Sequence, residues 1–275
     1  MSTLTISPVP AISQDSDRVR FVDVLRSEWT KLRSVPSTIW TILATLVIGI
    51  GVSALISALS AHDWANHADN HEGWDPTAMS TAGGALAQLA IAVLGTLVIT
   101  NEYANRTIRV SLGAVPHRSR LLGAKAVVVG AVALLVGELM AFASFFIGQA
   151  LISGQHAPTA SFSQPGVLRA VLGVGLYIAA IAVLGMGLGA LLRSTAGAIT
   201  SLVALLYVLP GLTAALPQGV RDPLQKYWPT LAGTSITNVV QDAKALGPWP
   251  GFAVFCLFVA LVLAVANLRL TRKDA

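Results

Sequence analysis

A single acid in an apolar stretch is the first residue that could carry chemistry. Glu138 lies in the segment LLVGELMAF and is the only ionisable residue well inside any long apolar run. An ionised acid in hydrocarbon costs about 2.5–3.5 kcal/mol on an insertion scale, so Glu138 is expected to face a bundle interior or a wet cavity. Two interpretations stay open: a group on a substrate or proton path, or a protonated residue that packs against a neighbouring helix.

A histidine-rich segment, residues 61–76, is the second candidate. On a helix, Asp63, His67 and His71 would share one face at four-residue steps, a geometry that suits zinc or copper. The segment has no cysteine, and a hydrated cap between two apolar runs explains the same residues. We therefore expect no metal site.

Motifs for covalent chemistry are missing from the sequence. The apolar runs hold no paired carboxylates, no HExxH and no Ser/His constellation, and the 275 residues contain neither a G-x-x-x-x-G-K-[ST] phosphate loop nor a Gly-Lys dipeptide. The prediction is a protein that is not an enzyme, binds no cofactor itself and cannot hydrolyse ATP alone. With one cysteine, Cys256, an intramolecular disulfide is impossible.

Composition indicates which solvent surrounds the elements that hold these residues. Hydrophobic residues make up 54% of the chain, charged residues only 11%, and the mean hydropathy is +0.70. Soluble domains carry roughly 25% charged residues, so the bilayer must be the solvent. The net charge of +5 is attributed to loops that face anionic lipid, and no nucleic-acid partner is expected.

Long apolar runs predict an all-α membrane protein with six transmembrane helices. Each run exceeds the roughly 20 residues that cross a bilayer. The predicted spans are residues 38–60, 79–100, 126–152, 170–192, 194–217 and 247–268.

The chain before the first span divides into two parts. Residues 1–20 are polar and predict a disordered cytoplasmic tail. Residues 21–36 predict an amphipathic helix at the membrane interface, and residues 37–275 form the six-span domain. The interfacial helix carries one apolar face, formed by Phe21, Leu25, Trp29 and Leu32.

The distribution of basic residues predicts the orientation of the chain in the membrane. Of the 18 lysines and arginines, only Arg169, Arg221, Lys226 and Lys244 fall in loops on the side opposite the N-terminus. The excess of positive charge in cytoplasmic loops therefore predicts that both termini are cytoplasmic.

Two patterns concern helix packing. Gly185 and Gly189 form a G-x-x-x-G motif in the fourth span, which predicts close approach to another helix of this chain or of a second subunit. Pro210 and Gly211 predict a kink or break in the fifth span.

The connection at residues 101–125 is long and charged at both ends. By itself, this pattern is also typical of a basic inside loop that only fixes topology. Three segments favour a functional role for this connection over a purely topological one. They are SEWTKLRSVPSTIW (27–40), ITNEYANRTIRVSLGAVPHRSRLLGAK (99–125) and SFFIGQALISG (144–154). In their order around six spans, together with YWPTLAGTSI (227–236), the chain resembles the permease subunits of type-2 ATP-binding-cassette exporters, specifically the actinobacterial branch. Arg106 departs from the glycine that the family often has at that place.

This resemblance implies a role for each region. Residues 21–34 would be the connecting helix, and residues 218–246 would form short external or partly re-entrant helices. Residues 101–120 would contain the coupling helix, which docks on a separate ATPase subunit that uses the ATP. Its contact residues would be Glu102, Tyr103, Arg106, Thr107 and Arg109. A second permease subunit, identical or different, and membrane lipids would be the other partners.

The function expected from this resemblance is export of a lipid-like, peptide or drug-like substrate across the bacterial plasma membrane. The alternative is an ATP-independent secondary carrier that uses Glu138 as its proton site. It has less support, because only one intramembrane acid is present and no inverted repeat is evident. A membrane-embedded enzyme has the least support, since the necessary constellations are missing.

Overall fold

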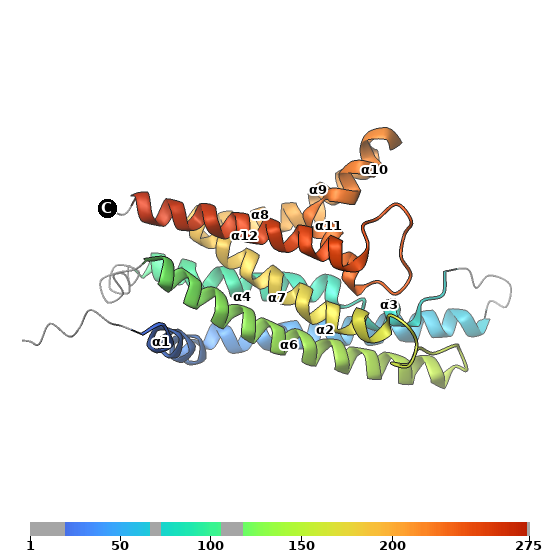
Figure 1. Ribbon diagram of the computed structural model, residues 1–275. Coiled ribbons are helices and arrows are strands. Elements are labelled where there is room, and N and C mark those ends of the chain that lie inside the picture. The colour runs from blue at the N-terminus through green and yellow to red at the C-terminus, as the bar shows by residue number, and fades with distance from the viewer. Residues whose placement is uncertain (1–19, 67–72, 106–117, 274–275) are drawn as a thin grey trace, which may run out of the picture.

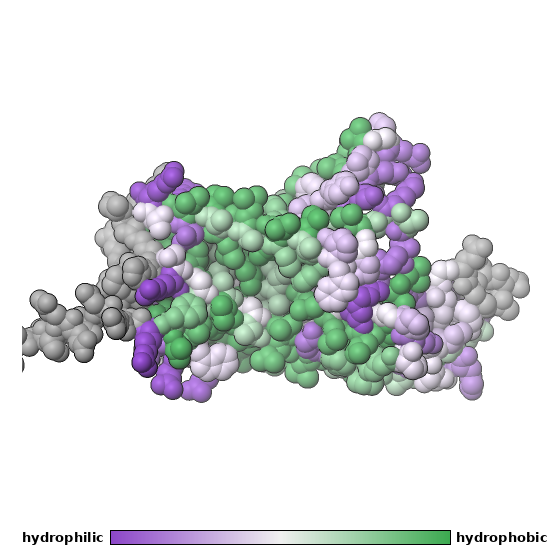
Figure 2. Space-filling view, in the orientation of Figure 1, coloured by the Kyte–Doolittle hydropathy of each residue, from purple (hydrophilic) through white to green (hydrophobic). Residues whose placement is uncertain are grey.

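The computed structural model describes residues 20–66, 73–105 and 118–273. Within these ranges the chain is helical and contains no strand, which confirms the all-α fold (Figure 1). Figure 2 shows a broad hydrophobic band between two ends where hydrophilic residues gather. This surface is the pattern expected of a bundle whose sides face lipid.

Six candidate membrane spans confirm the number predicted from the sequence. The first is α2 (Pro36–Asn66), and the second joins α3 (Pro76–Thr81) to α4 (Gly84–Ala104). The third and fourth are α6 (Arg118–Gly154) and α7 (Val167–Leu192). The sixth is α12 (Pro248–Lys273), and the fifth is interrupted.

Helix α7 lies at the centre and packs against α4, α6 and α12. Its G-x-x-x-G motif faces α4: a side chain on Gly185 would overlap the carbonyl oxygen of Ala92, and one on Gly189 would meet Ile99. The Thr96 hydroxyl shares its proton between the Ala92 carbonyl of its own helix, at 3.0 Å, and the Gly185 carbonyl across this contact, at 3.2 Å. Within the described residues, the motif therefore serves packing inside one chain.

The fifth span consists of α8 (Thr195–Val203), a π-helical turn (Ala204–Val208), α9 (Leu209–Leu212) and a 3-10 turn (Thr213–Ala215). In the π turn the N–H of Leu209 donates to the carbonyl of Ala204, five residues earlier. The same spacing would pair the Leu205 carbonyl with residue 210, but Pro210 has no N–H. Instead, the Trp228 indole and the Thr230 hydroxyl donate to Leu205, each at 3.2 Å. The predicted break is thus present. The Leu205 carbonyl, which it leaves without a backbone partner, accepts hydrogen bonds from side chains outside the span.

Residues 218–246 contain the short helices that the resemblance implied. They are α10 (Gln218–Tyr227), α11 (Pro229–Thr234) and the 3-10 turn η4 (Ser235–Thr237). Figure 1 shows α3 and α10 toward one end of the bundle and α1 and the C-terminus at the other. We call these the α3 end and the α1 end.

Helix α1 (Phe21–Ser34) buries a face that only partly coincides with the predicted apolar one. Val24 packs with Leu121 and Ala124 of α6, and Leu25 lies beside this cluster. Glu28 and Leu32 continue the buried face, Leu32 in the main core. Of the four residues predicted to form the interfacial face, Phe21 and Trp29 are exposed at 42% and 47%. The interfacial role remains a prediction.

Candidate functional site

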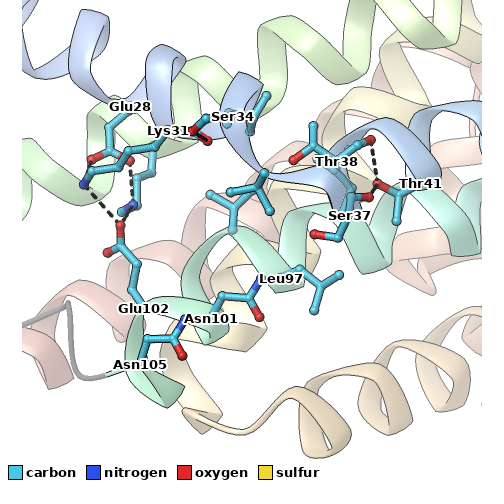
Figure 3. Close-up of a pocket in the computed structure, with 15 residues that line it drawn as sticks. Glu28, Lys31, Ser34, Ser37, Thr38, Thr41, Leu97, Asn101, Glu102 and Asn105 are labelled. Atoms are coloured by element: carbon cyan, nitrogen blue, oxygen red, sulfur yellow. Dashed lines mark hydrogen bonds and ion pairs between the residues drawn. The ribbon is translucent and has the colours of Figure 1, made fainter.

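Four charged side chains from three helices meet at the α1 end. Glu28 and Lys31 come from α1, Glu102 from the last turn of α4, and Lys125 from the second turn of α6. We call these four residues the charge cluster. Figure 3 shows Glu28 and Lys31 of α1 facing Glu102 of α4 across a short gap, joined by hydrogen bonds.

Lys125 occupies the centre of the charge cluster. Its Nζ lies 2.6 Å from Oε2 of Glu28 and 2.7 Å from Oε1 of Glu102. Lys31 makes a parallel pair of contacts, with Nζ 2.7 Å from Oε1 of Glu28 and 3.2 Å from Oε1 of Glu102. Each carboxylate therefore joins both lysines, and α1 is tied to α4 and α6 at one point.

Three members of the cluster are almost fully buried. Lys125 is 2% exposed, Glu28 4% and Glu102 9%. Isolated charges at such depth would be strongly disfavoured, but two acids and two bases give a neutral set with short, charge-assisted hydrogen bonds. Removing one partner leaves an unbalanced buried charge, so the cluster holds the three helices in one relative position.

Lys31 is the rim member of the cluster, with a side chain that is 43% exposed. Partial burial lowers the pKa of its ammonium, but the hydrogen bond to Glu28 and the negative charge of Glu102 outweigh this effect. The net result is a pKa raised above the ordinary value of 10.5.

A cavity of about 320 Å³ opens beside the charge cluster, between α1, the start of α2 and the last turns of α4. Figure 3 shows hydroxyl and amide groups around this space, among them those of Ser37 and Asn105. The lining therefore mixes polar and aliphatic side chains. Besides the cluster, the lining residues are Leu32, Ser34, Val35, Ser37, Thr38, Thr41, Leu94, Leu97, Val98, Asn101 and Asn105.

The arrangement supports mechanical and binding roles rather than covalent chemistry. Around the cavity, the strongest acids and bases neutralise one another, and no serine–histidine or cysteine–histidine pair lines it. No group of three His, Cys, Asp or Glu side chains that could hold a metal ion occurs among residues 20–66, 73–105 and 118–273.

The predicted ATPase-coupling residues divide into two sets. Glu102 lies in the charge cluster, and the ring of the adjacent Tyr103 lies 5.4 Å from the guanidinium carbon of Arg193, which ends α7. Arg106, Thr107 and Arg109 lie outside the described residues. In the described residues α4 continues to Ala104 and α6 begins at Arg118, so both helices extend into the predicted connection 101–125.

Sequence reasoning did not assign Glu28 and Lys125 to any site. A lysine before an apolar run, such as Lys125, usually marks a loop at the membrane surface, so its position in the sequence does not indicate a buried site. One signal was available. The two segments 27–40 and 99–125, which carry the family resemblance, contain every member of the charge cluster.

Glu138 lies elsewhere, near the middle of α6, and faces α7. Gly175 of α7 leaves room for it, since a side chain there would overlap the Glu138 carboxyl group. Its Oε2 is buried and has no hydrogen-bond partner in the described part of the chain. Glu138 is thus partly buried against α7, and both interpretations of its role stay open.

The predicted histidine face falls partly outside the described residues, which end at Asn66 and resume at Gly73. His62 and Asp63 lie in the last turns of α2, where the Asn66 amide nitrogen is 3.1 Å from Nε2 of His62. His67 and His71 are not described.

Comparison with known families gives a match over most of the chain. The model described as ABC-2 family transporter protein matches residues 24–211, which is more than half of the chain. No curated protein matches the sequence. The matched range includes most of α1, the whole charge cluster, the first four spans and most of the fifth.

Proposed function

Because the chain belongs to the ABC-2 family of transporter proteins and is a multi-pass permease subunit, we propose that it exports an amphipathic substrate across the bacterial plasma membrane. The substrate would be lipid-like, peptide or drug-like. A separate ATPase subunit supplies the energy, since the 275 residues contain no phosphate loop.

The charge cluster is the observation that carries the proposed mechanism. It joins α1 to the last turn of α4 and the second turn of α6, the two helices that flank residues 106–117. A force applied to this segment by the ATPase therefore reaches three helices together. Glu102 acts in this proposal by positioning the segment rather than by presenting a surface charge to the partner.

Arg106, Thr107 and Arg109 are then the proposed contacts with the ATPase, together with Tyr103 at the end of α4. Two permease subunits pair around the substrate path, with both termini in the cytoplasm. Closure of the ATPase favours the outward-facing state over the inward-facing one, and this differential stabilisation drives transport. The permease itself contributes no covalent step.

The test is the double variant Arg106→Glu/Arg109→Glu. Charge reversal places repulsive groups in the proposed interface, which strongly weakens association when a contact is buried. The full-length tagged protein is purified with its ATPase from native membranes, placed in nanodiscs and assayed for ATP hydrolysis. We expect the variant to be folded and to lose at least nine-tenths of the co-purified activity.

A matched control makes the same change of charge elsewhere at the α1 end. Arg26 and Arg33 are exposed on α1, so Arg26→Glu/Arg33→Glu should keep most of the ATPase. Equal activity in the Arg106/Arg109 variant and the unmodified protein would show that residues 106–109 are only a topological anchor.

A further inference from the structure

A second cavity, of about 240 Å³, lies toward the α3 end, between the α3–α4 junction, α7 and the α11–η4 segment. We call it the outer cavity. None of its lining side chains carries a charge at neutral pH. Its polar lining consists of Thr81, Gln88, Tyr177, Thr234, Thr237 and Asn238.

Gln88 is the most informative of these residues. It is only 7% exposed, and its Nε2 donates to the carbonyl of Ala85 at 2.8 Å. Its Oε1 is buried and has no hydrogen-bond partner in the described part of the chain. An unsatisfied buried acceptor is costly, so its presence at a cavity wall favours a bound group that donates to it.

The hydroxyl groups that line the outer cavity use their protons elsewhere. Thr81, Thr234 and Thr237 each donate to a backbone carbonyl three or four residues earlier, at 2.8–2.9 Å. Tyr177 donates to the carbonyl of Thr230 at 3.4 Å. A hydroxyl has one proton, so each of these oxygens has only lone pairs left to offer.

Glu138 lies behind one wall of the outer cavity. Its carboxyl group lies against Gly175, the residue that follows Val174 of the cavity lining, and its Oε2 is a second buried oxygen without a hydrogen-bond partner in the described part of the chain. The acceptor oxygens of this lining outnumber the amide N–H donors of Gln88 and Asn238, which disfavours phosphate or carboxylate groups as ligands. A group with several N–H donors and positive charge fits, since the Tyr177 ring also favours a cation.

We propose that the outer cavity binds the primary ammonium group of an amphiphile, and that the exported substrate belongs to this chemical class. The inference about the substrate rests on the proposed exporter function. The binding itself depends only on the acceptors of α3, α4, α7 and the α11–η4 segment.

The experiment measures equilibrium binding of radiolabelled n-octylamine to the full-length protein in nanodiscs of neutral lipid, without ATPase. Octyltrimethylammonium has the same charge and chain but no N–H donors, and octanoate has the opposite charge. We expect saturable binding of octylamine at least tenfold tighter than that of octyltrimethylammonium, and no saturable binding of octanoate.

Variants assign the binding to the outer cavity. Gln88→Leu and Thr237→Val each remove an acceptor and should weaken octylamine binding at least fivefold, whereas Gln88→Glu should strengthen it. Thr41→Val removes a hydroxyl from the cavity at the α1 end and is the matched control, with unchanged binding. If Gln88→Leu does not fold, the octylamine affinities of Thr237→Val and Gln88→Glu still test the proposal.

Equal binding of octylamine and octyltrimethylammonium would overturn the proposal, as would folded Thr237→Val and Gln88→Glu variants with unchanged affinity. These failures are separate from failure of the exporter function. Loss of selective amine binding with ATPase co-purification intact would refute only the cavity assignment. Selective binding by a protein that recruits no ATPase would refute only the exporter.

Discussion

The Nζ of Lys125 lies 2.6 Å from Oε2 of Glu28, although 97 positions separate these residues. The contact crosses from α6 to α1 and excludes nearly all solvent from both side chains, since they are 2% and 4% exposed. Helix α1 is therefore fixed to the bundle by charge as well as by the apolar contact of Val24 with Leu121.

This contact predicts a large loss of stability for Lys125→Met. The methionine keeps much of the side chain's volume but leaves Glu28 and Glu102 with only Lys31 to balance them. Removing one partner of a buried ion pair costs about 3–5 kcal/mol. The free energy of unfolding is measured by titration with sodium dodecyl sulfate and far-UV circular dichroism.

Arg120→Met is the control for this change, because Arg120 is exposed on the same helix. It should alter the free energy of unfolding by less than about 1 kcal/mol. A Lys125→Met protein as stable as this control would mean that the cluster does not hold α1 in place.

Stability should also depend on pH through Lys31. Its folded-state pKa is raised above the ordinary 10.5, so its contribution is fully present below that value and is lost as the pH rises through the folded-state pKa. Between about pH 10 and 12, the unmodified protein should lose more thermal stability than Lys31→Met does. Lys226→Met, on α10, should instead follow the unmodified protein, and identical profiles for all three would contradict the assignment.

The interrupted fifth span leads to a coupling prediction. Trp228→Phe removes one of the two donors to the Leu205 carbonyl and should cost about 1 kcal/mol. Pro210→Ala supplies a backbone N–H close to this carbonyl, so the same Trp228→Phe change should cost less in that background. Additive losses of unfolding free energy in the double variant would show that Pro210 is not the cause of the arrangement.

Close packing of α7 on α4 predicts that Gly185 cannot be replaced. Even alanine would overlap the Ala92 carbonyl oxygen, and rigid backbone cannot yield as a flexible side chain does. We expect Gly185→Ala to lower the melting temperature sharply or to prevent folding. Gly123→Ala on α6 adds the same methyl group where nothing lies within 4 Å, and it should be neutral or slightly stabilising, as measured by thermal unfolding in detergent.

Topology can be tested at two exposed positions, one at each end of the molecule. In a Cys256→Ala background, a Gly219→Cys protein should react with a membrane-impermeant thiol reagent added to intact cells. A Thr271→Cys protein should react only after the membrane is opened, because the basic residues place the C-terminus in the cytoplasm. The reverse pattern would invert the proposed orientation.

The sequence by itself determined the class of the fold. Twenty or more apolar residues in succession can avoid unsatisfied backbone groups in lipid only as helices, so six such runs required six spans. The break at Pro210 was equally determined, since proline removes a specific N–H whatever surrounds it. These features depend on local composition, and the structure confirms them.

Only the tertiary structure decided which charged residues belong together. Glu28, Glu102 and Lys125 look like ordinary interfacial charges, because the two acids each follow a polar residue and the lysine immediately precedes an apolar run. Their pairing depends on how α1, α4 and α6 cross, and no local sequence pattern predicts the angles at which these helices cross. The same holds for Gln88, whose unpaired oxygen becomes informative only because η4, distant in sequence, closes the outer cavity around it.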